Sequence, residues 1–216
     1  MTRVSQLPTL SAILFLSILC SVNVSANSQE LIDKGKTLYN QNCVFCHQAD
    51  AIGKAGFAPS LSNPELLAIA SDKYLMATIR DGRVGTSMVP YAHLGKEKIV
   101  AIVAYLRSHE TLTHRSTEVD KQRSAQGDAR KGALWYRDIC STCHGPEGDG
   151  YLAGSSGTAI GKAGFLNKAS DGFIRETIKY GRSNTRMLPF YGSTGLANLD
   201  EQEIEDIITY LRTLNK

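Results

Sequence analysis

Apolar residues recur at helical intervals near the end of each half of the chain. They stand at positions i, i+3, i+4 and i+7 in 99–106 and again in 204–211, which is the pattern of a helix with one buried face. The residues are Ile99, Ile102, Val103 and Leu106, then Ile204, Ile207, Ile208 and Leu211. No convincing period-two alternation typical of strands appears elsewhere. The pattern therefore predicts an all-α fold.

The segment that opens the first half also has a helical face. Leu31, Gly35 and Tyr39 share that face, and a glycine there lets another helix approach closely. Asp200 stands directly before the closing helix of the second half, where an N-cap is expected. Each half is therefore predicted to be helical from its opening segment to its last.

The first residues have the features of a targeting segment. An apolar run over 10–19 follows a short basic start, and small residues suit cleavage after Ala26. Because this run is too short to span a bilayer, residues 1–26 are predicted to be a signal peptide; an uncleaved membrane anchor is the alternative. Cys20 would be discarded with it. The mature chain is thus predicted to have no transmembrane segment and to be exported to the periplasm.

The remaining sequence contains an internal repeat. Residues 31–107 align with 128–212, which indicates two diverged copies of one unit. The shared motifs are CVFCH (43–47) with CSTCH (140–144), GKAGF (53–57 and 161–165), SMVPY (87–91) with RMLPF (186–190), and Tyr-Leu-Arg (105–107 and 210–212). With the GKAGF motifs aligned, the first copy gains extra residues that include 63–65, and the second has a longer glycine-rich loop over 145–160. Such insertions are tolerated in loops.

A polar, charged segment separates the two copies. It runs from Thr111 to Gln126 and is nearly free of large apolar residues, as linkers are. A structureless loop of that length inside one compact domain is uncommon. We therefore predict a first domain over 27–110, a linker over 111–127 and a second domain over 128–216.

The composition adds limits on the partners. The chain has 216 residues, of which 42% are hydrophobic, so a packed core is expected. The net charge is +3, with both signs dispersed along the sequence. Neither nucleic acid nor an anionic membrane surface is therefore favoured as a partner.

The cysteines of the mature chain form two pairs with the same spacing. They are Cys43 with Cys46 and Cys140 with Cys143, followed directly by His47 and His144. C-x-x-C-H is the attachment signature of c-type haem, because two thioethers fix the porphyrin edge and leave the next residue under the iron. A zinc site built from both pairs would leave the histidines unexplained, and a thioredoxin-like site needs a βαβ context. Two covalently attached haem c groups are predicted, with both histidines as iron ligands.

A second axial ligand is inferred in each copy. After His144, the second copy has no further histidine and only one methionine, Met187; a lysine or an open site are the alternatives. In the first copy the repeat selects Met88, because M-x-P followed by an aromatic residue occurs at both places. The other candidates there are Met76, His93, His109 and His114. His/Met ligation raises the reduction potential and fills both axial positions, which suits electron transfer better than binding of small molecules.

Two further residue types have candidate roles around the haems. Arg83 and Arg182 each follow a glycine and are candidates to pair with haem propionates; a solvated surface arginine is the alternative. Pro59 is a candidate to orient His47 by accepting the outer N–H of its ring through a backbone carbonyl.

These motifs resemble those of class I cytochromes c, in which an opening helix leads to C-x-x-C-H, a methionine loop follows and a closing helix packs back. The tandem arrangement resembles dihaem proteins such as cytochrome c4. Carried over by motif, one haem site comprises Cys43, Cys46, His47 and Met88, and the other Cys140, Cys143, His144 and Met187. Two departures stand out. The second copy has 167–168 and no proline where the first has Pro59, and Gln48 replaces the glycine present as Gly145.

The resemblance implies an exported electron carrier between a donor and an acceptor redox protein of a respiratory or periplasmic chain, and not an enzyme. A haem c subunit of a larger dehydrogenase or oxidase complex, associated with the membrane through that complex, is the alternative. The third reading is a dihaem enzyme. A peroxidase needs an iron that opens to substrate, and a thiosulfate dehydrogenase typically uses a cysteine ligand, for which the mature chain has no further cysteine.

Overall fold

The computed structural model describes residues 11–215, with side chains from residue 27 onward, and its regular structure is helical. Within that range there is no strand, only two isolated bridges, Lys54 with Ala58 and Tyr191 with Leu199. The all-α prediction is confirmed. The predicted signal peptide, 1–26, lies outside the residues whose side chains are described, and it stays a prediction. Among the described residues, no helix combines the length and apolar character needed to cross a bilayer.

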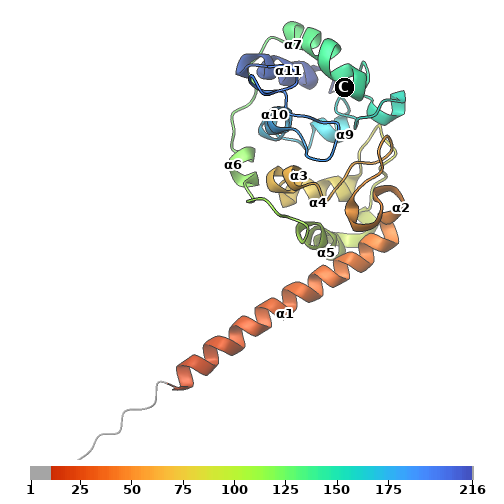
Figure 1. Ribbon diagram of the computed structural model, residues 1–216. Coiled ribbons are helices and arrows are strands. Elements are labelled where there is room, and N and C mark those ends of the chain that lie inside the picture. Colours follow the sequence, from red (N-terminus) through yellow and green to blue (C-terminus); the bar gives the residue numbers. More distant parts are fainter. Residues whose placement is uncertain (1–10, 216) are drawn as a thin grey trace, which may run out of the picture.

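The helices form two sets joined by a short connecting helix (Figure 1). The first set comprises α1 (Ser11–Asn42), α2 (Val44–His47), η1 (Ala49–Ala51), α3 (Pro64–Ile69), α4 (Asp72–Asp81), η2 (Ala92–Leu94) and α5 (Gly95–Arg107). The connection holds α6 (Ser116–Asp120). The second set comprises α7 (Ala129–Trp135), the π-helical turn η3 (Tyr136–Cys140), α8 (Ser141–His144), η4 (Gly150–Ala153), α9 (Ala163–Leu166), α10 (Asp171–Tyr180) and α11 (Glu201–Thr213).

In both halves the opening helix crosses the closing helix at a glycine. A Cβ atom on Gly35 of α1 would overlap the carbonyl oxygen of Ala101 in α5. One on Gly132 of α7 would overlap the carbonyl oxygen of Asp206 in α11. The close approach predicted at Gly35 is therefore confirmed, and the second half repeats it.

Two tyrosine rings pack beside each of these crossings. The ring centroids of Tyr39 and Tyr105 lie 5.2 Å apart, and those of Tyr136 and Tyr210 lie 5.3 Å apart. Offset aromatic pairs of this kind add to the stability that burial alone supplies. Because the two pairs occupy the same places on α5 and α11, these closing helices correspond residue by residue.

The arginine of the shared Tyr-Leu-Arg motif ties the closing helix to a short helix earlier in the same half. Arg107 and Arg212 each donate two hydrogen bonds to backbone carbonyl oxygens in or just after that helix. The acceptors are Leu67 and Ala70 in the first half, and Leu166 and Ala169 in the second. Helices α3 and α9 therefore correspond, and this pairing fixes the alignment of the two halves from there to the methionines.

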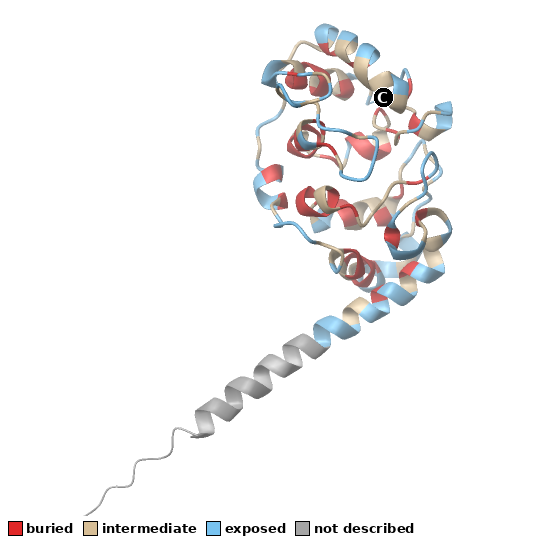
Figure 2. Cartoon of the chain, viewed as in Figure 1, coloured by how far each residue is buried: buried red, intermediate tan, exposed pale blue. Residues whose placement is uncertain are grey.

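The two halves pack against each other through α3 and α4 on one side and α9 and α10 on the other (Figure 1). The rings of Tyr74 and Phe173, which occupy corresponding positions, lie 4.8 Å apart. One cluster of buried hydrophobic residues includes members of both halves. Figure 2 shows buried residues on the inward faces of α5, α10 and α11 and exposed residues outside. The halves therefore share a packed interface.

The polar connection between the halves lies against the second half. Val119 of α6 is buried, and four successive backbone N–H groups, at 125–128, donate to side chains of α10 and α11. The acceptors are Asp171, Glu205, Thr209 and Asp206. We call residues 121–128 the strap. These contacts satisfy the backbone donors of the strap.

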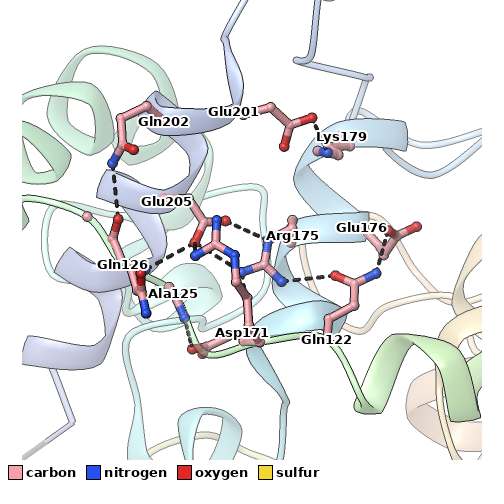
Figure 3. Close-up of polar contacts among 12 residues, drawn as sticks. Gln122, Ala125, Gln126, Asp171, Arg175, Glu176, Lys179, Glu201, Gln202 and Glu205 are labelled. Atoms are coloured by element: carbon pink, nitrogen blue, oxygen red, sulfur yellow. Dashed lines mark hydrogen bonds and ion pairs between the residues drawn. The ribbon is translucent and has the colours of Figure 1, made fainter.

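The strap rests on a buried ion pair (Figure 3). Nε of Arg175 lies 2.6 Å from Oε1 of Glu205, and Glu205 is only 2% exposed. The side chain of Gln122 accepts a further hydrogen bond from Arg175 at 2.9 Å. The corresponding positions in the first half are apolar, Met76 and Val100. The ion pair therefore belongs to the half that the strap covers.

Candidate functional site

The two C-x-x-C-H motifs occupy the same place in the two halves, directly after the opening helix. None of these four cysteines forms a disulfide bond. Burial raises the pKa of Cys43 to about 11, with a smaller effect of Cys46, and raises that of Cys140 to about 12. Zinc binds the thiolate, and among residues 27–215, whose side chains the structure describes, no group of three or more His, Cys, Asp or Glu side chains is placed to hold a metal ion. The geometry does not support the zinc alternative.

The histidine of each motif is held through the outer nitrogen of its ring. Nδ1 of His47 lies 2.9 Å from the carbonyl oxygen of Pro59, and Nδ1 of His144 lies 2.7 Å from that of Thr158. Burial lowers the pKa of both imidazoles. Each ring is therefore held neutral, with Nδ1 donating to the carbonyl and Nε2 left for a metal. The orienting role predicted for Pro59 is confirmed.

The residue that orients His144 differs from the one at which the sequence pointed. The alignment placed the counterpart of Pro59 at 167–168, but the structure gives this role to Thr158 in the glycine-rich loop. A Cβ atom on Gly157 would lie 2.9 Å from Nδ1 of His144, so a side chain there would displace the ring. The glycine immediately before Thr158 is the signal that could have located it.

The error came from the identical GKAGF motifs, which do not correspond in the structure. Residues 53–57 form a turn closed by the bridge between Lys54 and Ala58, whereas 163–165 begin helix α9. Once Pro59 is paired with Thr158, the two halves have equal lengths from that carbonyl to the methionine. The extra residues predicted in the first copy are therefore wrong. The identical five-residue sequences gave a wrong alignment of the two halves, because the conformation of so short a sequence depends on its surroundings.

The methionines Met88 and Met187 stand on loops with the same internal hydrogen bonds. In the first loop, the N–H of Arg83 donates to the carbonyl oxygen of Met88 at 2.9 Å, and the N–H of Met88 donates to the hydroxyl of Thr86 at 3.1 Å. The corresponding distances in the second loop are 2.7 and 3.0 Å. The residues there are Arg182, Thr185 and Met187. The repeat that selected Met88 from the sequence thus has a structural counterpart.

The other candidate iron ligands of the first half pack elsewhere, bond to other groups or are exposed. Met76 packs against the core from α4, at the position that Arg175 fills in the second half. His109 packs against Tyr105, with ring centroids 5.0 Å apart. His114 is bonded to a carboxylate oxygen at 2.8 Å, and His93 is exposed in η2. These contacts favour Met88 over the alternatives.

Of the two arginines that follow Gly82 and Gly181, Arg182 has a free donor for an anion, whereas Nη2 of Arg83 donates to the hydroxyl of Tyr74 at 2.7 Å. Nη1 of Arg182 is buried and has no hydrogen-bond partner among the described residues, although Nη2 donates to Thr177 at 3.2 Å. Burial lowers the pKa of Arg182 to about 10. A buried guanidinium nitrogen without a partner is costly, and a carboxylate from outside the chain would satisfy it. A haem propionate is such a carboxylate, so Arg182 fits the predicted cofactor.

Comparison with known proteins assigns both halves. Residues 30–106 match the family described as cytochrome C oxidase, cbb3-type, subunit III, and residues 129–215 match the cytochrome c family. The chain contains two cytochrome c domains. Each carries one C-x-x-C-H motif, and two haem c groups are therefore bound covalently. The assignment of individual residues to each haem stays a prediction, which the geometry above supports.

Two relatives of the two-domain chain are subunits of cbb3-type cytochrome c oxidases. It is 30% identical to the cbb3-type cytochrome c oxidase subunit CcoP of Rubrivivax gelatinosus, over 84% of this chain and 54% of that protein. It is 27% identical to the subunit FixP of Bradyrhizobium diazoefficiens, over 84% and 60%. The chain thus spans little more than half the length of these relatives. It also resembles a chain of the Kuenenia stuttgartiensis reducing HAO-like protein complex Kustc0457/Kustc0458, with TM-score 0.50, 18% identity and coverage of 85% and 96%, a likeness that concerns the fold alone.

Proposed function

We propose that this chain carries electrons through two haems that each have one histidine and one methionine ligand. His47 and Met88 would hold the first iron, and His144 and Met187 the second. The observation that carries the proposal is the doubled geometry. Each histidine is fixed at Nδ1 by a backbone carbonyl, and each methionine stands on a loop with the same closing hydrogen bonds.

The residues of the chain position the proposed iron ligands and keep other molecules away from the iron. The haem, when bound, supplies the redox couple. Tyr39 and Tyr136 donate from their hydroxyls to the carbonyl oxygens of Gln48 and Gly145, each at 2.7 Å. These bonds hold the residue after each C-x-x-C-H motif, and with it the start of the loop that returns to the histidine. A site whose two axial donors are both fixed changes little on electron transfer and keeps other molecules away from the metal.

We further propose that the chain works in the periplasm, as the haem c subunit of a larger respiratory oxidase complex or as a close counterpart of one. Matches to cbb3-type subunits over most of this chain support this assignment. They favour the subunit alternative over a free shuttle of the cytochrome c4 type. The chain would then receive electrons from one redox protein and pass them to the catalytic subunit, with no substrate reaction of its own.

Carbon monoxide tests the closed sites directly. The ferrous protein should bind almost none, Met88→Ala should bind about one equivalent, and Met187→Ala should also bind about one. Uptake of two equivalents by the unaltered protein would contradict the proposed ligands. Turnover of hydrogen peroxide or thiosulfate by the purified protein would instead support the enzyme reading.

Native extraction tests the assembly. Membranes solubilised in mild detergent should release the chain together with an oxidase activity on gel filtration. The purified protein is first reduced on its own. Its haems should be reoxidised when that oxidase fraction is added. Elution of all the protein at the size of a single chain from the soluble periplasmic fraction would favour the shuttle instead.

A further inference from the structure

The two domains meet around their methionine loops. The shift in numbering that relates the two methionines also relates Val84 to Ser183 and Glu65 to Gly164. Val84 and Ser183 lie on the two methionine loops, and each touches the opposite domain: Ser183 contacts Glu65, and Val84 contacts Gly164. The interface therefore has two corresponding contacts, and they are built from different residues.

The contact on the second loop is a polar clasp, formed by Asn63, Glu65 and Ser183. Oε2 of Glu65 accepts from both the backbone N–H and the hydroxyl of Ser183, each at 3.0 Å. Nδ2 of Asn63 donates to the carbonyl oxygen of Ser183 at 3.0 Å. Asn63 is buried, and its Oδ1 caps helix α3, so the donor is anchored. Three hydrogen bonds from the first domain thus surround one residue of the second.

The carboxylate of the clasp is held in its charged form. Burial alone would raise the pKa of Glu65, but hydrogen bonds from backbone N–H groups and from the Ser183 hydroxyl outweigh burial and bring the pKa below its ordinary value. Hydrogen bonds to an ionised acceptor are about twice as strong as neutral ones. Glu65 therefore contributes most of the clasp's strength.

The contact on the first loop has no such clasp. A Cβ atom on Gly164 would overlap the backbone nitrogen of Val84, so the loop rests directly on the backbone of the second domain. Beside it, the guanidinium of Arg83 lies 5.0 Å from the ring centroid of Phe165. This side is held by packing and a cation–π contact, which are less specific in direction than hydrogen bonds.

We propose that each domain braces the methionine loop of the other, and that the clasp of Glu65 and Asn63 on Ser183 positions the Met187 loop. The inference rests on the proposed role of Met187 as an iron ligand. Inside this loop, the bonds from Arg182 to Met187 and from Met187 to Thr185 close the loop on itself. Its own domain holds this loop near its ends, where Arg182 donates to Thr177 and the N–H of Phe190 donates to the carbonyl oxygen of Ile178. The clasp adds a tie from the other domain at Ser183, which is exposed. Glu65 is thus a positioning residue that acts on the second haem from the first domain.

The test uses the protein with both haems bound and measures the methionine-to-iron band of one loop at a time. In the Met88→Ala background, the near-infrared methionine-to-iron band of the ferric protein arises from Met187 alone. In the Met187→Ala background it arises from Met88 alone. Imidazole is added to each, and the concentration that removes half of the band reports how readily the loop opens. Glu65→Ala, Glu65→Gln and Ser183→Val are introduced into both backgrounds, with Glu97→Ala as a matched loss of an exposed carboxylate from the first domain.

The clasp predicts an effect on one loop only. In the Met88→Ala background, Glu65→Ala should lower the half-point for imidazole about tenfold, the effect expected for loss of a charge-assisted contact, and Ser183→Val, which removes only the hydroxyl, should lower it about threefold. Glu65→Gln, which keeps an acceptor, should lower it less. In the Met187→Ala background the same changes should alter the half-point less than about twofold, as should Glu97→Ala in either background.

Three results would count against the proposal. An unchanged half-point in the Met88→Ala background would overturn the brace while leaving Met187 as the ligand. Equal shifts in both backgrounds would show general loosening of the protein and would overturn it as well. Absence of any band in the Met88→Ala protein would remove Met187 as a ligand, and the brace with it. If Glu65→Ala does not fold, Ser183→Ala removes only an exposed hydroxyl and should still lower the half-point about threefold.

Discussion

In the first domain, Met76 and Val100 occupy the positions that Arg175 and Glu205 occupy in the second. The frame around them is the same, since the opening and closing helices cross at Gly35 in one domain and at Gly132 in the other. The two domains differ in the segment that packs over these positions. The strap lies on the second domain and brings backbone donors that need acceptors, and Glu205 of the ion pair accepts from one of them, the N–H of Gln126. Among the residues that the structure describes, no such segment covers the first domain at this place, and the two positions there are apolar.

The comparison separates two kinds of residue. The residues that both domains share either set backbone geometry or are the ones we propose to hold the haems. They are the crossing glycines, the tyrosine pairs, the closing-helix arginines, the C-x-x-C-H motifs and the methionine loops. The residues that differ between the domains contact segments that are present beside one domain only. A repeat within one chain therefore shows which residues the haem site needs and which ones the assembly of the two domains needs.

Breaking the ion pair should have the largest effect on stability. Arg175→Met leaves the carboxylate of Glu205 buried with only the more exposed Arg123, 3.3 Å away, for compensation. We expect a loss of about 4 kcal/mol in the free energy of unfolding. Chemical denaturation followed by circular dichroism measures it. Arg80→Met, which removes an exposed pair with Asp81, is the control and should leave the free energy of unfolding almost unchanged.

The double variant Arg175→Met/Glu205→Val sharpens the same comparison, because it gives the second domain the residues of the first. Replacing both charges leaves no unpaired charge, so the double variant should lose less than Arg175→Met alone. Some loss should persist, since the N–H of Gln126 loses its acceptor at 3.1 Å. A double variant that is less stable than either single variant would show that the two sites do not form one coupled unit.

The glycine crossings should respond alike in the two domains. Gly35→Ala and Gly132→Ala each place a methyl group on a carbonyl oxygen of the facing helix, so the helices must separate. We expect each to cost about 3 kcal/mol in unfolding free energy. Lys36→Ala, at an exposed position on the same helix as Gly35, serves as the control in thermal denaturation. A large loss in one domain and none in the other would refute the shared frame.

The residue after C-x-x-C-H should respond in opposite directions in the two domains. Gln48 has φ 63° and ψ 170°, and Gly145 has φ 79° and ψ 159°, a region that is essentially restricted to glycine. Gln48→Gly should therefore raise the free energy of unfolding by about 1 kcal/mol, and Gly145→Gln should lower it by about 1 to 2 kcal/mol. Paired denaturation curves decide this, and a destabilising Gln48→Gly would rule out backbone strain at that position.

The smallest expected effect is a difference in the pH dependence of stability. Burial alone would raise the pKa of Glu205, but the hydrogen bond and charge of Arg175 bring it below its ordinary value. A carboxyl group whose pKa is lower when folded stabilises the protein above its unfolded pKa, about 4.3, and this contribution is lost as the pH falls through the folded pKa. Between about pH 6 and about pH 3, Arg175→Met/Glu205→Val should therefore lose less unfolding free energy than the unaltered protein. Parallel curves would contradict this account of Glu205.

Local patterns in the sequence predicted the frame and the haem motifs. Helical periodicity, the C-x-x-C-H spacing and the repeated methionine loop depend on residues close together in the chain, and they led to the all-α fold and the two haems. GKAGF misled because its conformation is set by what packs on it: Phe57 is exposed in the first domain and Phe165 is buried in the second. Other contacts join segments that are distant in sequence, and residue spacing does not predict them. They are the clasp on Ser183, the contacts of the strap and the carbonyl of Thr158.

The near-infrared methionine-to-iron band of the ferric protein tests the central claim most directly, namely that the two domains hold two equivalent His/Met haem sites. The intensity per protein should fall by half in Met88→Ala, by half in Met187→Ala, and to zero in the double variant. Met76→Leu, which changes the rival methionine, should leave the full band. A single variant that removes the whole band, or a double variant that keeps any of it, would contradict the account.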